Sequence, residues 1–198
     1  MDEWHIKQLN TLSKLIKPNW HFADVGVARG EMTDLLSPLM DKGYLFEADP
    51  STYSQLEKKY ASFDKLTLNN NAVYSEEGFV DFSVNGEFIG GIAKHTQNKS
   101  VESVKVKTIT LDKYFKDKKI NLIKIDVEGA EFEVLKGAKE LMNSQSPIFQ
   151  VEFHWDEDWT DENLEFIKKS EYYIYDLNLK KINLKNRPYQ AILLKGEL

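Results

Sequence analysis

A glycine-containing segment near the N-terminus has the residue types of a ligand-binding turn. The sequence Asp24-Val25-Gly26-Val27-Ala28-Arg29-Gly30 lies between a predicted strand at 20–25 and a predicted helix at about 31–40. Free N–H groups at the start of a helix favour a carboxylate or a phosphate. By themselves, Gly26 and Gly30 fit a plain strand-to-helix turn equally well. As a ligand site, the turn would use Asp24, Gly26 and Gly30 together.

Glu47 makes the interpretation of this turn more specific. It ends the second predicted strand, where a carboxylate can accept hydrogen bonds from both hydroxyls of a ribose. The turn reads Gly-x-x-x-Gly instead of the Gly-x-Gly-x-x-Gly of dinucleotide sites, and the chain has no Gly-Lys-Ser/Thr phosphate loop. Asp24 would bind an amine. S-adenosylmethionine carries a carboxylate, an amine and a ribose, so it is the predicted cofactor.

A second group of candidates follows two later strands. Asp126 and Glu128 come just after the predicted strand 120–125, and His154 follows the strand 147–153. Ligands bind beyond the carboxyl ends of strands in open α/β sheets. We predict Asp126, Glu128 and His154 as catalytic, with Asp126 or His154 as the general base. The alternatives are carboxylates that stabilise a helix dipole and a surface histidine. For Glu131, the structural role is favoured.

Two further features near these residues leave alternatives open. Asp126, Glu128 and His154 could bind Mg²⁺ or Mn²⁺, but nothing in their spacing requires it, so no metal is predicted. The segment after the strand fits either a solvated loop before a helix capped by Thr160 or a rim that recognises an amine or a sugar. Its acidic and aromatic residues are Glu152, Trp155, Asp156, Glu157, Asp158 and Trp159.

The elements that must position these residues alternate between strand and helix. Strands are predicted at 20–25, 44–47, 66–68, 120–125, 147–153, 172–177 and 191–194, with helices at 9–16, 31–40, 51–60, 129–143 and after Thr160. This order predicts a Rossmann-like, doubly wound α/β sheet with helices on both faces. Residues 79–110 break the alternation, and we expect an inserted β-hairpin there.

Composition excludes several classes of protein. The chain has 198 residues, 26 Lys and Arg against 32 Asp and Glu, and no cysteine. The net charge of −6 disfavours nucleic acid and anionic membranes as partners, and the missing cysteine excludes thiolate chemistry. No apolar stretch reaches the ~20 residues of a membrane span, and the N-terminus lacks a signal sequence. We expect one cytoplasmic domain over 1–198, with an N-terminal helix within 1–18.

The chain resembles the FkbM family of S-adenosylmethionine-dependent methyltransferases over roughly residues 20–155. The resemblance rests on Asp24-Val25-Gly26 with Gly30 and Thr33, on Phe46-Glu47 with Asp49-Pro50, on Asn71-Ala72-Val73-Tyr74-Ser75 with Gly78, on Thr110-Leu111-Asp112, and on Ile123-Lys124-Ile125-Asp126-Val127-Glu128-Gly129-Ala130-Glu131. It implies a seven-stranded sheet whose last strand is antiparallel, and O-methylation as the reaction. It also implies that Asn71, Ala72 and Val73 lie near the adenine. Two positions depart from the family's usual residues, with Ala28 in place of Asn and Ala48 in place of Pro.

Together these observations predict an enzyme that methylates a hydroxyl on a sugar or a secondary-metabolite-type small molecule. The loop 85–100, which contains Gly86, Gly90 and Gly91, is expected to close over this acceptor. Two alternatives remain. One is a nicotinamide-dependent oxidoreductase, which the missing middle glycine disfavours. The other is a catalytically inactive module that binds the cofactor or a partner.

Overall fold

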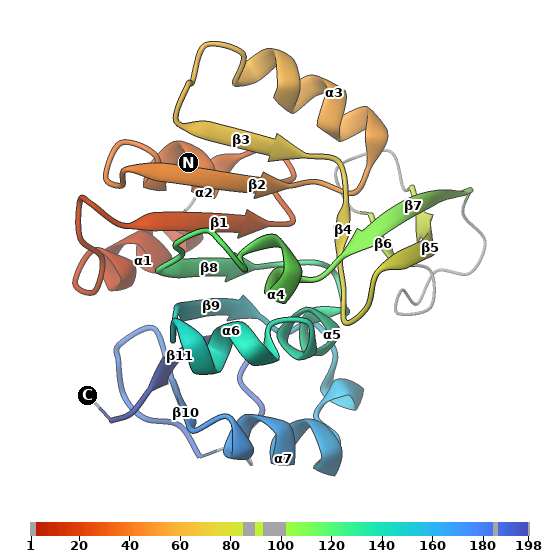
Figure 1. Cartoon of the computed structure of the whole chain (residues 1–198). Helices are drawn as coiled ribbons and strands as arrows, with labels where there is room; N and C mark the ends of the chain where they lie inside the picture. Colours follow the sequence, from red (N-terminus) through yellow and green to blue (C-terminus); the bar gives the residue numbers. More distant parts are fainter. Residues whose placement is uncertain (1–2, 85–89, 93–101, 184–185, 198) are drawn as a thin grey trace.

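A seven-stranded sheet forms the centre of the computed structural model, which describes residues 3–84, 90–92, 102–183 and 186–197 (Figure 1). Its strands are β1 (His21–Val25), β2 (Lys42–Phe46), β3 (Leu66–Asn69), β8 (Leu122–Ile125), β9 (Ile148–Glu152), β10 (Tyr172–Tyr175) and β11 (Gln190–Lys195). They lie in the order β10-β11-β9-β8-β1-β2-β3. The last strand, β11, runs antiparallel to both of its neighbours, β10 and β9, and the other neighbouring strands of this sheet are parallel to each other. The predicted fold class is confirmed.

Helices cover both faces of this sheet. One face packs on α1 (Glu3–Leu12), α2 (Glu31–Leu36) and α3 (Pro50–Lys59), and the other on α4 (Leu111–Tyr114), α5 (Glu131–Lys136), α6 (Lys139–Ser144) and α7 (Asp161–Lys169). Successive strand residues alternate between the two faces, so Phe22 packs in the first core and Ala23 in the second. Two buried apolar layers therefore fix the strand ends at which the site lies.

A smaller sheet stands beside the carboxyl ends of the parallel strands (Figure 1). It consists of β4 (Ala72–Val73), β7 (Ser103–Ile109), β5 (Gly78–Ser83) and β6 (Gly91–Ile92), in that order. Strand β5 pairs antiparallel with β7 from Gly78 opposite Thr108 to Ser83 opposite Ser103. This pair is the inserted hairpin predicted at 79–110. It forms a separate sheet with its own apolar cluster around Phe82 and Val106 and does not extend the main sheet.

The first turns of two helices are fixed by side-chain caps. Asp49 accepts hydrogen bonds from the backbone N–H groups of Ser51 (2.7 Å) and Thr52 (3.2 Å) at the start of α3. Thr160 accepts one from Asn163 (3.2 Å) at the start of α7, as the sequence predicted. Such caps contribute about 1 kcal/mol each. They hold both helices in place beside the strand ends.

Three predicted helices differ from the observed ones. The first, expected at 9–16, is observed as α1, which begins at Glu3 and ends at Leu12. The helix expected at 129–143 is divided into α5 and α6 around Gly137, and the helix expected at 31–40 ends at Leu36. Gly137 lies so close to the carbonyl oxygen of Tyr74 that a Cβ atom would be 2.1 Å from it. That contact with a distant segment favours the interruption. Across the described parts of the chain, the helices are too short or too polar to cross a lipid bilayer.

Candidate active site

The glycine turn after β1 has the left-handed backbone that the sequence suggests. The φ angles of Gly26, Ala28 and Gly30 are 80°, 50° and 84°. A Cβ atom at Gly26 would lie 1.7 Å from the carbonyl oxygen of Asp126, so only glycine allows the turn to approach the end of β8 this closely. The turn and the first catalytic candidate are thus in direct backbone contact.

Asp24 lies beneath this turn and is fully buried. The Thr33 hydroxyl donates a hydrogen bond to its Oδ2 atom (2.6 Å), and the Lys124 ammonium lies 3.1 Å from its Oδ1 atom. Lys124 also donates to the carbonyl of Gly26 (2.6 Å). Asp24 therefore braces the turn from below. Its predicted contact with the methionine end of the cofactor stays a prediction.

Glu47 joins the end of β2 to the same turn. Its Oε2 atom accepts a hydrogen bond from the N–H of Ala28 (3.0 Å), and its Oε1 atom accepts one from Asp49 (2.9 Å). Burial raises the pKa of Glu47 to about 7, although both backbone hydrogen bonds act to lower it. Each carboxylate oxygen has a second lone pair, so Glu47 can still accept hydrogen bonds from a ligand.

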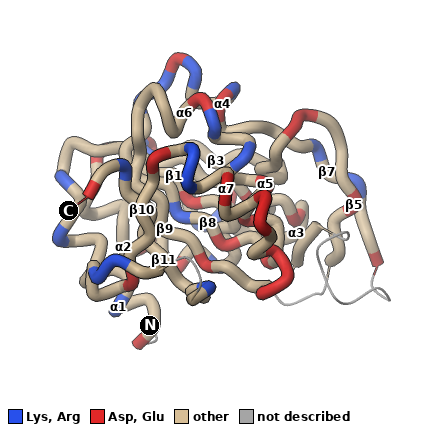
Figure 2. Tube along the Cα trace, turned by 90° about the horizontal axis from the view of Figure 1, so that it is seen from below, with Lys and Arg blue, Asp and Glu red and all other residues tan. Residues whose placement is uncertain are grey.

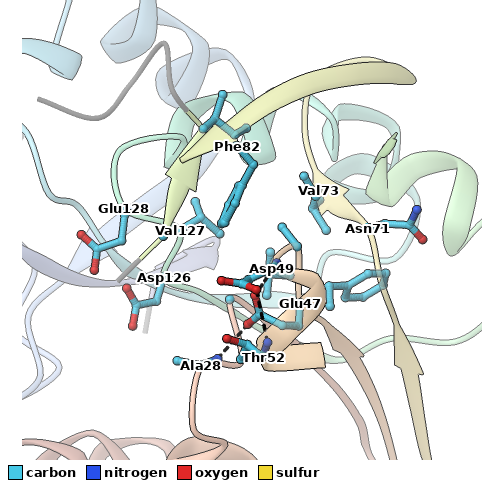
Figure 3. A pocket seen from close by; sticks show the side chains of 17 residues that line it. Ala28, Glu47, Asp49, Thr52, Asn71, Val73, Phe82, Asp126, Val127 and Glu128 are labelled. Atoms are coloured by element: carbon cyan, nitrogen blue, oxygen red, sulfur yellow. Dashed lines mark hydrogen bonds between the residues drawn. The ribbon is translucent and has the colours of Figure 1, made fainter. Parts of the chain in front are cut away.

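One pocket connects Glu47 with the end of β8 (Figure 3). Its polar side comes from the turn and from β2, and its apolar side comes from Val73, Phe82, Ile92 and Val127. The lining residues are Val25, Gly26, Ala28, Phe46, Glu47, Ala48, Asp49, Thr52, Asn71, Ala72, Val73, Phe82, Gly90, Ile92, Asp126, Val127 and Glu128. Most of the predicted site residues meet here. Asp24, Gly30 and His154 are outside the lining.

Asp126 and Glu128 lie between this pocket and the side chain of His154. The Nε2 atom of His154 is 3.6 Å from Oδ1 of Asp126 and 3.6 Å from Oε2 of Glu128. Its Nδ1 atom is 2.7 Å from Oε1 of Glu131, which is 1% exposed. The three catalytic candidates are therefore neighbours. Glu131 orients the imidazole ring. The sequence had favoured only a structural role for Glu131 in its helix.

The charges in this group shift one another's pKa values. Burial of the His154 ring acts to lower its pKa. The hydrogen bond that His154 donates to Glu131 and the charges of Glu131, Glu128 and Asp126 outweigh this and raise the pKa to about 9. Burial raises the pKa of Asp126, and the nearby Lys124 opposes that rise. At neutral pH, His154 is thus a cation held among carboxylates and not a free base.

Glu152, the last residue of β9, is held by side chains from both ends of the chain. Gln190 donates to its Oε2 atom at 2.9 Å, and Gln8 and Trp4 of α1 donate to the same atom at 3.4 Å. The Tyr189 ring lies 5.9 Å from the Trp4 ring and 5.6 Å from the His154 ring. Helix α1 therefore reaches the edge of the catalytic group.

The acidic and aromatic segment after β9 divides into two parts. Trp159 is 4% exposed and packs against Phe153 and Phe132, so it belongs to the core and not to a rim. The acidic residues of the 3₁₀ turn η1 (Asp156–Asp158) gather with those at the start of α7, close to α5 (Figure 2). Burial raises the pKa of Asp158 to about 6. The exposed part of this segment is a strongly anionic surface.

Sequence reasoning missed the supporting residues of the site. Lys124 is 5% exposed. A lysine within an otherwise apolar strand requires a partner of opposite charge, so the sequence itself indicated a buried ion pair at this position. Trp4, Gln8 and Tyr189 carried none, because they approach Glu152 or His154 only through tertiary structure.

A sequence match to a known family covers every predicted site residue. The family model described as the methyltransferase FkbM domain matches residues 24–177. The chain belongs to the FkbM methyltransferase family. The predicted resemblance, the methyltransferase class and S-adenosylmethionine as the cofactor are confirmed at the level of this family. No curated protein matches the sequence closely enough to count as a relative.

Several solved structures share the fold. Methyltransferase FkbM from Methylobacillus flagellatus is 16% identical with a TM-score of 0.62, and the match covers 95% of this chain and 47% of that one. An rRNA methylase from Streptococcus thermophilus is 12% identical with a TM-score of 0.58, covering 100% of this chain and 98% of the other. A protein from Streptococcus mutans described as a methyltransferase, in complex with SAH, is 16% identical with a TM-score of 0.56, covering 99% and 100%. This chain thus spans about half the length of the first of these structures.

Proposed function

We propose that this protein transfers the methyl group of S-adenosylmethionine to a hydroxyl group of a sugar or a secondary-metabolite-type small molecule. The observation that carries the proposal is the continuity of the pocket from Glu47 to Asp126 and Glu128. A ribose-binding carboxylate and a candidate base thus line one space.

The pocket residues fit the cofactor. Glu47 has free lone pairs for the two ribose hydroxyls, and Gly26 and Ala28 of the turn line the same space. The apolar side chains of Val73, Phe82 and Ile92 can enclose a flat ring, and Asn71 lies beside them as a polar group. When bound, S-adenosylmethionine supplies a methyl group attached to a positively charged sulfur, and this sulfur is a good leaving group.

The protein's contribution to the reaction is alignment and proton removal. Asp126 lines the pocket and is 31% exposed, so an acceptor hydroxyl can reach its carboxylate. His154 already carries a proton at neutral pH, which makes Asp126 the better acceptor of the hydroxyl proton. Glu128 borders the same space and can orient the acceptor through a second hydrogen bond.

The surroundings of the base favour an acceptor rich in hydroxyl groups. Ionised carboxylates accept hydrogen bonds and cannot donate them, so Asp126 and Glu128 pair with hydroxyl donors. The Tyr189 ring, which is 47% exposed, packs against His154, and the Trp4 ring, which is 40% exposed, packs against Tyr189. Both rings offer flat apolar surfaces at the edge of this group. Such a combination suits a polyhydroxylated ring.

Calorimetric titration with S-adenosylmethionine and its demethylated product tests the first half of the proposal. We expect micromolar binding to the wild type and a loss of at least tenfold in Glu47→Ala. Glu165→Gln, on the exposed face of α7, serves as the control and should bind normally. Absence of binding by the wild type, or tight binding of NADH instead, would overturn the cofactor assignment.

Transfer of a labelled methyl group to a panel of acceptors tests the second half. We expect label on sugars or phenolic and polyketide-type alcohols, and a drop in kcat of about 10²–10⁴-fold in Asp126→Asn with little change in cofactor affinity. Label found on amines or on RNA would overturn the acceptor class. Wild-type activity in Asp126→Asn would remove Asp126 as the base.

A further inference from the structure

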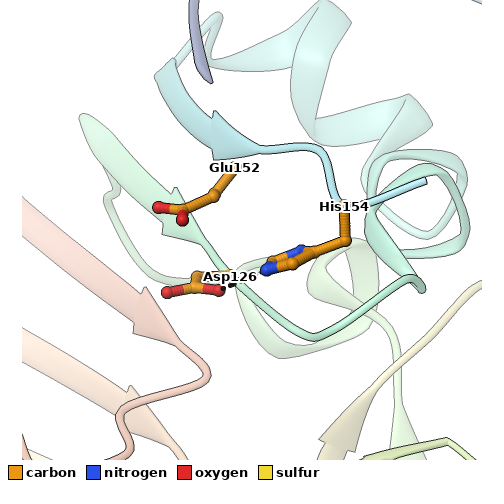
Figure 4. Close-up of side chains that lie close together, drawn as sticks. All are labelled: Asp126, Glu152 and His154. Atoms are coloured by element: carbon orange, nitrogen blue, oxygen red, sulfur yellow. Dashed lines mark ion pairs between the residues drawn. The ribbon is translucent and has the colours of Figure 1, made fainter. Parts of the chain in front are cut away.

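We propose that Asp126, Glu152 and His154 bind a divalent metal ion, of the class that Mn²⁺ represents. The three side chains converge from the ends of two adjacent strands, β8 and β9 (Figure 4). One ligand atom from each residue lies within 4.8 Å of the others. Opposite ligands on a small divalent ion are about 4.2 Å apart, and those on Ca²⁺ are about 5 Å apart. The three ligand atoms are therefore close enough together for one ion to bind all of them after small side-chain movements.

The orientation of His154 is the first argument for this site. Glu131 is buried and bonds Nδ1 of the ring, which turns Nε2 toward Asp126 and Glu128. Proteins fix metal-binding histidines in this way, with a carboxylate on the second ring nitrogen. The 3.6 Å separations at Nε2 are too long for hydrogen bonds. The separation from Asp126 is compatible with two neighbouring ligands of one shared ion.

Glu152 is fixed by groups outside the cluster. One of its oxygens, Oε2, accepts hydrogen bonds from Gln190, Gln8 and Trp4, which come from β11 and α1. These donors hold the carboxylate beside Asp126 and His154 at a position where it is 9% exposed. Three neutral donors orient this nearly buried carboxylate without neutralising its charge. Its negative charge therefore remains available to a cation.

The balance of charge gives an independent reason. Four carboxylates, those of Asp126, Glu128, Glu131 and Glu152, surround two cationic groups, Lys124 and His154. Even with His154 protonated, the group carries an excess of two negative charges. A divalent ion that replaces the proton on Nε2 adds one net positive charge and halves this excess, and the attraction is strengthened because the site is partly shielded from water.

The ligand types narrow the choice of metal. Carboxylate oxygens suit Mg²⁺ and Mn²⁺, whereas an imidazole nitrogen suits first-row transition metals. Mn²⁺ satisfies both preferences. Because Asp126 also lines the pocket, the ion would lie beside the acceptor oxygen and lower the pKa of a bound hydroxyl. Asp126 would then hold the ion through Oδ1, which faces His154, and its second oxygen would remain to accept the hydroxyl proton. That last consequence rests on the proposed function, but metal binding itself does not.

Titration of metal-depleted protein with Mn²⁺, followed by electron paramagnetic resonance and calorimetry, tests the site. We expect one ion per chain in the wild type and at least tenfold weaker binding in both Glu152→Gln and His154→Gln. Glu131→Gln removes the charge of the orienting partner, leaves the three ligands in place, and should weaken binding by about 10–100-fold. Glu165→Gln is the matched acidic control and should bind like the wild type.

Two results would overturn the proposal. One is a wild type that takes up no stoichiometric Mn²⁺ at millimolar concentration. The other is Mn²⁺ binding that is unchanged in His154→Gln. Circular dichroism and binding of the demethylated cofactor, measured on each variant, separate a lost site from a lost fold. They also separate the two proposals, because a protein that binds the cofactor but not Mn²⁺ contradicts only the metal site.

Discussion

The ammonium group of Lys124 lies 3.1 Å from Oδ1 of Asp24, and both side chains are buried. The two residues face each other across adjacent strands, β8 and β1. The same ammonium donates to the carbonyl of Gly26 and lies 3.5 Å from Oδ2 of Asp126. Lys124 thus connects the turn that would hold the cofactor with the carboxylate that would accept the proton.

Replacement of Lys124 by methionine should destabilise the protein strongly. Burial acts to lower the pKa of Lys124, but the charges of Asp24 and Asp126 outweigh it and keep the ammonium ionised. Removing it leaves the buried carboxylate of Asp24 and the partly buried carboxylate of Asp126 without this partner, which costs about 3–5 kcal/mol. Urea unfolding of Lys124→Met measures this loss.

Lys169→Met provides the control for that experiment. Lys169 pairs with Glu165 on the surface of α7, at 3.5 Å, with its side chain 75% exposed. Such a pair contributes only about 0.3–0.5 kcal/mol. Equal losses in the two variants would show that Lys124 is not a structural link between the turn and the catalytic residues.

Glu47 should make cofactor binding depend on pH near neutrality. Its pKa of about 7 means that the carboxyl group is protonated in most molecules at pH 6 and ionised in most at pH 8. A carboxylate that must accept two ribose hydroxyls has to be ionised, so affinity for the demethylated cofactor should rise about tenfold from pH 6 to pH 8. Glu47→Gln reports any titration of the ligand itself. A slope as steep in this variant as in the wild type would contradict the prediction.

The sequence contained enough information for the main sheet, because its strands are apolar runs separated by helices. Ile123 and Ile125 on β8, for example, are fully buried, as a central parallel strand requires. The turn at Gly26 and the carboxylate of Glu47 also follow from local sequence, since each lies directly at a strand end. Their convergence in one pocket was predictable for the same reason.

Other features depend on contacts between distant residues and could not be predicted locally. The division between α5 and α6 depends on the approach of Gly137 to Tyr74. The donation from Trp4 to Glu152 joins residues 148 positions apart. Trp159 follows three acidic residues in a polar segment, yet its ring is taken into the core by Phe132 and Phe153.

Gly26→Ala should unfold the protein at lower denaturant concentration and abolish cofactor binding. The new Cβ atom would collide with the carbonyl oxygen of Asp126, and alanine is also strained at a φ angle of 80°. We expect a loss of roughly 3 kcal/mol or more. Gly196 has the same φ angle with nothing within 4 Å of its Cβ position, so Gly196→Ala should lose about 1 kcal/mol or less. Similar losses in both variants would mean that the contact with Asp126 is unimportant.

Ala28→Asn should stabilise the protein slightly. Ala28 has a φ angle of 50°, in the left-handed region that asparagine adopts more readily than alanine. The backbone N–H that donates to Glu47 is retained, so the turn keeps its link to β2. We expect a gain of about 0.5 kcal/mol in the free energy of unfolding. Ala61→Asn, at an exposed position, is the control, and Ala28→Val should lose stability because a branched side chain is strained in this conformation. A loss of stability in Ala28→Asn would show that the new side chain cannot be accommodated beside the pocket.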